Sequence, residues 1–200
     1  MRQMSSESGK CHIVYIPGLG DGYDGLRRAG LFTWHLWGVS TELVPMKWYG
    51  GGDLATRHAL VAAAIDKAQR RGRRVILVGE SAGASLAINV ASRRPDIHGL
   101  MTICGIVNSR AEVSATIREK SPAFNQSLAQ LEHDIGKLDL AKVCNVRAVV
   151  DSIVPRQSSV IRGATQRVVL GIGHVTTVTL CLSLYSGLLV HFARAIKKVQ

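Results

Sequence analysis

The chain has 200 residues, of which 46% are hydrophobic and 20% charged, and its net charge is +11. These values are typical of one folded globular domain and exclude a disordered or fibrous chain. Its four cysteines lie far apart and form no CxxC pair, which argues against a disulfide scaffold, a zinc motif or a redox motif. We expect reduced thiols in a cytoplasmic protein, with residues 1–10 as a flexible N-terminus and 11–200 as a single domain.

Strand-like and helix-like segments alternate along the chain. Short apolar runs predict strands at residues 12–16, 42–46, 74–79, 98–107, 146–150 and 167–170. Helical spacing or longer apolar stretches predict helices at residues 24–38, 53–71, 82–93, 122–135 and 176–195. Continuous apolar strands that alternate with helices are typical of a parallel sheet covered on both faces. We therefore predict an α/β fold with a doubly wound, mostly parallel sheet of about six strands.

The predicted C-terminal helix over 176–195 is apolar enough to suggest a membrane span. His191 and Arg194 interrupt it, however, and Ser183 and Ser186 dilute its hydrophobicity. A helix that lies across a parallel sheet is equally apolar, so we predict a buried helix. The N-terminal residues lack the apolar stretch of a secretory signal, which fits the expected cytoplasmic location.

A G-x-S-x-G motif occupies residues 79–83, directly between a predicted strand and a predicted helix. In that context the chain must reverse sharply, which strains the backbone at Ser81 and leaves no room for side chains at Gly79 and Gly83. Such a turn lifts a serine hydroxyl above the carboxyl edge of the sheet. We therefore predict Ser81 as a nucleophile. The alternative is an ordinary strand-to-helix turn that uses glycines for close packing.

A serine nucleophile needs a base and a group that orients the base. These partners are expected after later strands, in the order Ser, Asp, His. Asp151 follows the strand at 146–150, and His174 stands in a glycine-containing loop after the strand at 167–170. We predict His174 as the base and Asp151 as its orienting acid. Asp134 and Asp139 are the competing acids, but both lie in or near a predicted helix.

Two backbone amides are candidates for an oxyanion hole. Ala82 follows the nucleophile at the N-terminus of the next helix, where the helix dipole favours negative charge. Leu19 lies in a loop of small residues after the first strand, between Gly18 and Gly20. We predict the Leu19 and Ala82 amides as the donors. Chemistry of this kind needs neither a metal nor a cofactor, and we expect neither.

Four segments together resemble landmarks of the α/β-hydrolase superfamily: Pro17-Gly18-Leu19-Gly20, the motif at 79–83, the segment 151–155 and Gly173-His174. The resemblance implies a carboxylesterase, lipase or thioesterase-like activity through an acyl-enzyme, on a small-molecule ester or thioester. Pro17 stands where many members have histidine, and Ala84 stands where many esterases have a further glycine. The stretch 108–142, where larger members insert a cap, is short, so the chain looks like a minimal version.

Competing interpretations have weaker support. A dinucleotide fingerprint at Gly20, Gly22 and Gly25 lacks an acidic residue at the end of the second strand, since Glu42 opens that strand. A basic cluster at Lys67, Arg70, Arg71, Arg73, Arg74, Arg93 and Arg94 suggests an acidic partner.

That cluster is predicted to lie opposite the active site and has no interleaved aromatic residues, so we expect no specific nucleic acid. A weak electrostatic contact with acidic partners or a membrane surface stays open. Two further functional alternatives are a catalytically inactive binding module with this fold and an acyltransferase that uses the same triad.

Overall fold

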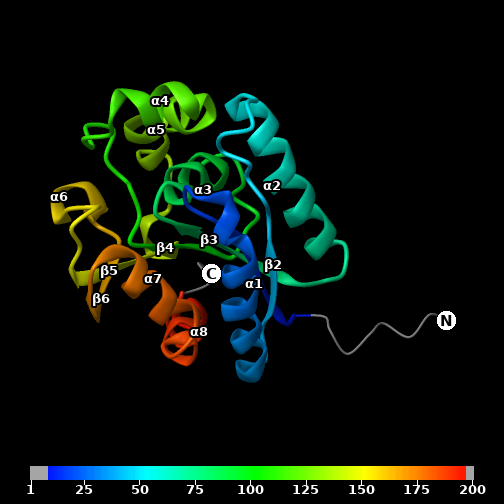
Figure 1. Ribbon diagram of the computed structural model, residues 1–200. Helices are drawn as coiled ribbons and strands as arrows, with labels where there is room; N and C mark the ends of the chain where they lie inside the picture. The colour runs from blue at the N-terminus through cyan, green and yellow to red at the C-terminus, as the bar shows by residue number, and fades with distance from the viewer. Residues whose placement is uncertain (1–8, 197–200) are drawn as a thin grey trace.

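Six parallel strands form the centre of the molecule (Figure 1). The structure is a computed structural model and describes residues 9–196, so almost all of the predicted flexible segment 1–10 lies outside the described residues. The strands are β1 (Cys11–Ile16), β2 (Ser40–Leu43), β3 (Arg74–Glu80), β4 (Gly99–Ile103), β5 (Val143–Val150) and β6 (Thr165–Ile172). Their order across the sheet is β2-β1-β3-β4-β5-β6. The prediction of a parallel sheet of about six strands is confirmed.

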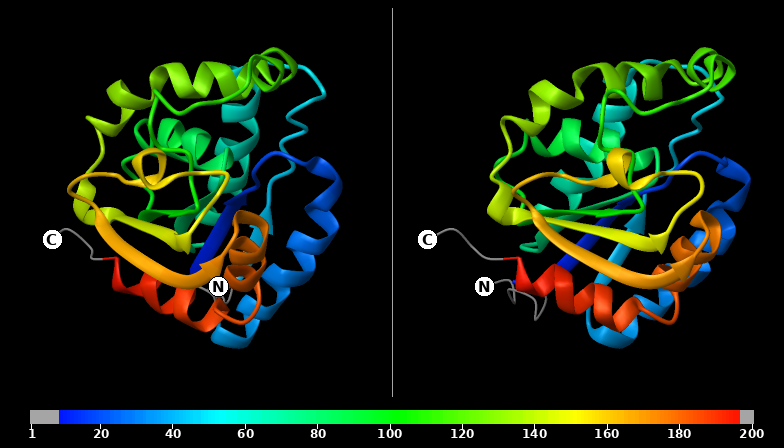
Figure 2. Two further views of the ribbon diagram at one scale, coloured as in Figure 1. Left: turned by 60° about the vertical axis from the view of Figure 1, so that its left-hand side comes forward. Right: turned by 90° about the vertical axis from the view of Figure 1, so that its left-hand side faces the viewer.

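Helices cover both faces of this sheet (Figure 2). One face packs against α2 (Leu54–Gln69) and α3 (Gly83–Ala91), with α5 (Pro122–Ile135) laid over α3. The other face packs against α1 (Asp24–Phe32), α7 (His174–Leu182) and α8 (Ser186–Ala195). Short helices are η1 (Asp21–Tyr23), η2 (Thr33–Trp37), α4 (Ala115–Lys120), η3 (Leu140–Lys142) and α6 (Arg156–Ser159). The layered arrangement confirms the predicted doubly wound architecture.

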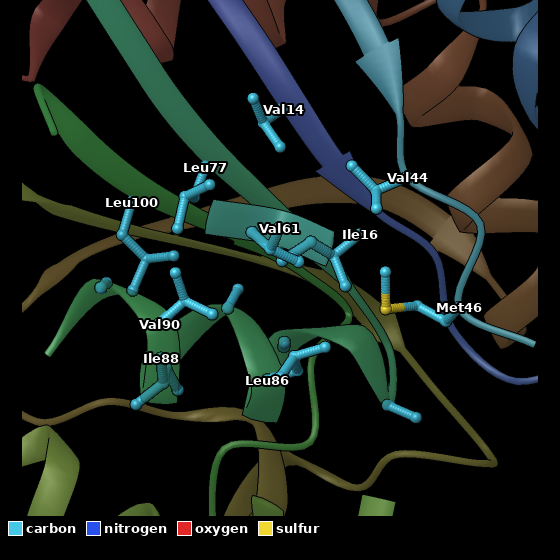
Figure 3. Packing of buried hydrophobic residues seen from close by; sticks show 14 of the residues in the cluster. Val14, Ile16, Val44, Met46, Val61, Leu77, Leu86, Ile88, Val90 and Leu100 are labelled. Carbon is cyan, nitrogen blue, oxygen red and sulfur yellow. The ribbon is translucent and has the colours of Figure 1, made fainter. Parts of the chain in front are cut away.

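Alternate residues of the central strands supply two separate cores. Leu77 belongs to the cluster under α2, α3 and α5, whereas its neighbour Ile76 belongs to the cluster under α1 and α8. Figure 3 shows Leu77 and Leu100 facing Val90 of α3. Each fully buried Leu or Ile contributes about 1.5–3 kcal/mol. Because β3 is buried on both faces, its residues read as one continuous apolar run.

The prediction of a single helix over 176–195 is wrong. The structure has α7 and α8, joined at a bend of 76°. The carbonyl of Leu182 accepts hydrogen bonds from Thr33 Oγ1 at 3.0 Å and Trp34 Nε1 at 3.2 Å, so side chains of η2 stabilise the end of α7. Within residues 9–196 no single helix is long and apolar enough to cross a membrane, and the two helices reach that threshold only when they are taken together.

The predicted strand over 98–107 is too long. β4 ends at Ile103, because Cys104 takes a left-handed conformation with φ of 47°. That early end turns the chain away from the sheet beside the carboxyl end of β3. As a result, residues 104–106 lie beside the turn that carries Ser81, and the amide of Ile106 donates to the carbonyl of Ser81 at 3.0 Å.

Candidate active site

The strand-turn-helix context predicted for the G-x-S-x-G motif is present. β3 ends at Glu80, α3 begins at Gly83, and Ser81 between them has φ of 49°. A Cβ at Gly83 would lie 2.3 Å from the carbonyl oxygen of Ile16, and one at Gly79 would lie 2.6 Å from the Cα of Ala84. Both positions therefore require glycine. The left-handed backbone of Ser81 is strained, and the close packing of the neighbouring residues holds it in that conformation.

Asp151 and His174 lie side by side at the carboxyl ends of β5 and β6. The distance between His174 Nδ1 and Asp151 Oδ2 is 2.8 Å, and both side chains are 8% exposed. The other carboxylate oxygen accepts from the backbone amides of Ile153 at 2.9 Å and Val154 at 2.8 Å. Since an ionised carboxylate can only accept hydrogen bonds, the hydrogen of the His174 ring must be on Nδ1. Nε2 is then left as the proton acceptor.

The electrostatic environment keeps Asp151 ionised. Burial by itself raises the pKa of the Asp151 carboxyl, but the hydrogen bonds from His174 and from the two backbone amides outweigh burial. The net result is a pKa below the usual value. Asp134 and Asp139, the two competing acids, have other partners. Asp134 binds Arg93 at 2.9 Å, and Asp139 caps η3 through the amide of Ala141.

Ser81 stands at the same edge of the sheet as this pair. The amide of Ser81 donates to the carbonyl of Ile103 at 3.0 Å. Cys104, which follows Ile103, has its sulfur within 4.8 Å of a carboxylate oxygen of Asp151 and a ring nitrogen of His174. Within the described part of the chain, no hydrogen bond joins the Ser81 hydroxyl to His174. The structure therefore brings the predicted acid and base into contact, and it has the predicted nucleophile at the end of β3, with β4 between β3 and β5.

The loop after β1 packs directly on the turn at residues 80–82, the nucleophile turn of the prediction. A Cβ at Gly18 would lie 2.8 Å from the Cβ of Ser81. Among the described residues, no acceptor binds the amides of Leu19 or Ala82. Ala82 is also the N-cap of α3, where the dipole of the helix favours a negative charge. The two predicted oxyanion donors are therefore unused backbone N–H groups on the two segments that meet at Ser81.

A buried ion pair, which the sequence pattern does not indicate, lies beneath this junction. Glu80 binds Arg27 through two hydrogen bonds, Nε to Oε2 at 2.8 Å and Nη2 to Oε1 at 2.7 Å. Tyr15 donates to Glu80 Oε2 at 2.6 Å. Arg27 also donates to the carbonyls of Leu19 at 3.1 Å and Gly20 at 2.8 Å. The sequence offers one feature that bears on this pair, the charged residue Glu80 at the first x position of the G-x-S-x-G motif.

Cys104, Asp151 and His174 are close enough together to hold a metal ion. The chemistry of the donors does not suit one. Burial raises the pKa of the Cys104 thiol well above its usual value, and the nearby Cys181 and Asp151 act in the same direction. The sulfur is thus a thiol at neutral pH, whereas metals bind the thiolate. The Nδ1 and Oδ2 atoms are also already committed to each other.

Lys67, Arg93 and Arg94 of the predicted basic cluster form ion pairs within the chain. Arg94 binds Asp66 at 2.8 Å and Asp96 at 2.7 Å, and Lys67 binds Glu42 at 3.0 Å. The ion pair with Lys67 also occupies the carboxylate of Glu42, which a dinucleotide site would need for binding a ribose hydroxyl.

No protein-family model matches the chain, and no curated protein matches its sequence. Solved structures do match its shape. Est1E from Butyrivibrio proteoclasticus with ferulic acid bound has a TM-score of 0.68 at 16% identity, covering 98% of this chain and 93% of that one. MGS-MChE2, an α/β-hydrolase enzyme from a sediment metagenome of the Mar Chica lagoon in Morocco, has a TM-score of 0.64 at 17% identity, covering 94% and 92%.

A monoacylglycerol lipase from Paleococcus ferrophilus has a TM-score of 0.59 at 14% identity, covering 94% of this chain and 95% of that one. These neighbours match nearly the whole of both chains. The likeness establishes that this chain has the α/β-hydrolase fold. A fold of this kind does not by itself specify the chemistry, which depends on the residues at the site.

Proposed function

We propose that this protein is a serine hydrolase that cleaves a carboxylic ester or thioester through an acyl-enzyme intermediate. The observation that carries the proposal is the hydrogen bond of 2.8 Å between Asp151 and His174. It joins two residues that are 23 positions apart in the chain. It also lies at the sheet edge where a strained turn presents Ser81.

In the proposed reaction, Ser81 Oγ attacks the carbonyl carbon while His174 Nε2 takes the hydroxyl proton. Asp151 holds the ring in the tautomer that makes Nε2 the acceptor. The carbonyl oxygen becomes an oxyanion, which the Leu19 and Ala82 amides stabilise. The bond to the alcohol or thiol then breaks, and the leaving group takes the proton from His174. Water, activated by the same base, releases the acid from Ser81.

A hollow of about 520 Å³ is a candidate for the substrate's organic part. It is lined by Tyr49, Thr116, Ile117 and Lys120. Tyr49 directly follows Trp48, whose buried indole donates to the carbonyl of Pro17 at 3.0 Å. A hollow of this size fits a small acyl or alcohol group. The proposed substrate class is a small-molecule ester or thioester, which the esterase and lipase names of the structural neighbours support.

The experiment that tests the proposal is labelling of the purified protein with a fluorophosphonate probe, which reacts with activated serines. We expect labelling of the wild type and none of Ser81→Ala. His174→Ala should also lose labelling, because the hydroxyl then has no base. Folded wild-type protein that resists the probe would overturn the proposal and favour an inactive binding module. Labelling that persists in Ser81→Ala would assign the nucleophile elsewhere.

A further inference from the structure

We infer that Arg27 and Glu80 are positioning residues that hold the oxyanion loop against the nucleophile turn, an inference that rests on the proposed function. Glu80 directly precedes Ser81, and Arg27 lies on α1 beyond the loop. Glu80 is 4% exposed and Arg27 is 7% exposed. The pair is therefore a buried connection between the two segments that supply the proposed oxyanion donors.

The guanidinium of Arg27 uses its donors on both segments at once. Two of them meet the two carboxylate oxygens of Glu80, a bidentate geometry that lysine cannot reproduce. The same group reaches the carbonyls of Leu19 and Gly20. Gly20 has φ of 92°, so the loop bends here in a conformation that glycine adopts freely. Arg27 thus fixes a turn that the backbone alone would leave adjustable.

The carboxylate of Glu80 also touches the loop. A Cβ at Gly18 would lie 3.0 Å from Glu80 Oε1, and this oxygen is one of the two that bind Arg27. The amide of Leu19 belongs to the peptide between Gly18 and Leu19. Arg27 and Glu80 therefore constrain the chain on both sides of that amide, from the Gly18 Cα to the Leu19 carbonyl.

Arg27 has an electrostatic role as well. The proposed transition state develops a negative charge beside Ser81, and Glu80 holds a buried carboxylate one residue away. Unpaired, that carboxylate would repel the oxyanion in a medium of low dielectric constant. The guanidinium, which also pairs with Asp24 at 3.1 Å, and the Tyr15 hydroxyl, 2.6 Å from Oε2, offset this charge before the reaction begins. Removal of Arg27 would both loosen the loop and expose the oxyanion to this repulsion.

A purely structural ion pair would behave differently, and the chain provides a control for that case. Arg93 binds the fully buried Asp134 at 2.9 Å at the far end of α3. Arg93→Met therefore leaves a buried carboxylate without its arginine, as Arg27→Met does, but away from Ser81. Arg28→Met is a second control, since it removes an exposed arginine next to Arg27 on the same helix.

The test measures kcat and KM with a short-chain nitrophenyl ester, together with urea unfolding. We expect Arg27→Met to lower kcat by about 10² or more, the usual cost of a lost oxyanion donor, with KM within threefold. Arg27→Lys should recover part of kcat, because it restores the positive charge but not the fork. The double variant Arg27→Met with Glu80→Gln should have a kcat about tenfold higher than that of Arg27→Met alone, because the second substitution removes the unpaired carboxylate of Glu80. Arg93→Met should lower the urea midpoint and leave kcat unchanged.

A folded Arg27→Met variant with kcat within threefold of wild type would overturn the inference. So would a double variant that is no faster than Arg27→Met alone. If Arg27→Met does not fold, Arg27→Lys and Glu80→Gln decide the matter, with a tenfold loss of kcat expected in each and an unchanged kcat refuting the inference. Failure of the proposed function is distinguishable, because wild-type protein would then resist the fluorophosphonate probe.

Discussion

Replacement of Asp151 by asparagine tests the acid-base pair with little change in shape. In the wild type, Oδ1 accepts from the amides of Ile153 and Val154, and Oδ2 faces His174 Nδ1. An NH₂ group cannot accept a hydrogen bond, so the amide oxygen of asparagine must take the position of Oδ1. Its NH₂ group then points at His174 and donates to Nδ1. This forces the ring into the tautomer with hydrogen on Nε2, which cannot receive a proton from Ser81.

The expected loss is large in activity and small in stability. The wrong tautomer costs about 10⁴-fold in kcat in the serine protease that serves as the template for this chemistry. For this protein we expect a loss of about 10³–10⁴-fold, which corresponds to about 4–5.5 kcal/mol of transition-state stabilisation. The two backbone hydrogen bonds survive, so the free energy of unfolding should change by about 1 kcal/mol.

The assay is kcat/KM for a nitrophenyl ester at fixed pH, with the unfolding free energy measured in urea. Asp139→Asn is the matched control, because Asp139 also accepts from a backbone amide but caps η3 instead of facing a histidine. We expect wild-type activity in that control. Activity of Asp151→Asn within tenfold of wild type would refute the tautomer argument and remove Asp151 from the proposed triad.

Two further predictions concern stability. Gly83→Ala would place a Cβ 2.3 Å from the carbonyl oxygen of Ile16. We therefore expect the free energy of unfolding in urea to fall by about 3 kcal/mol and fluorophosphonate labelling to be lost. Gly22→Ala is the control, because a Cβ there meets open space, and it should change neither the stability nor the labelling. Burial and the charge of Arg73 lower the pKa of His12 from 6.5 to about 4. The folded state therefore resists protonation, and stability present above pH 6.5 is lost as the pH falls toward 4, by about 3 kcal/mol. His12→Asn should lose less stability over this range than wild type, whereas the exposed His133→Asn should lose as much; equal losses for wild type and His12→Asn would contradict the assignment.

The sequence predicts those parts of the site that local geometry dictates. A turn from strand to helix that presents a serine requires glycines at positions 79 and 83, and those glycines are visible in the sequence. Parallel strands place the residues that follow them at one edge, so the positions of Asp151 and His174 follow from their strands. The break after Leu182 was not predictable, because the groups that bind its carbonyl come from Thr33 and Trp34, about 150 positions earlier.

The Arg27–Glu80 pair could not be predicted either, because it also joins residues that lie far apart in the chain. Glu80 occupies the x position of the motif, where backbone geometry sets no requirement, and its partner lies 53 positions away on α1. A buried carboxylate is destabilising without a partner, so Glu80 commits the chain to an arginine at this point of α1. The same arginine is then available to the carbonyls of the oxyanion loop. The x residue and the loop are therefore coupled through one guanidinium, and a substitution at either end should be tolerated only when the other end changes with it.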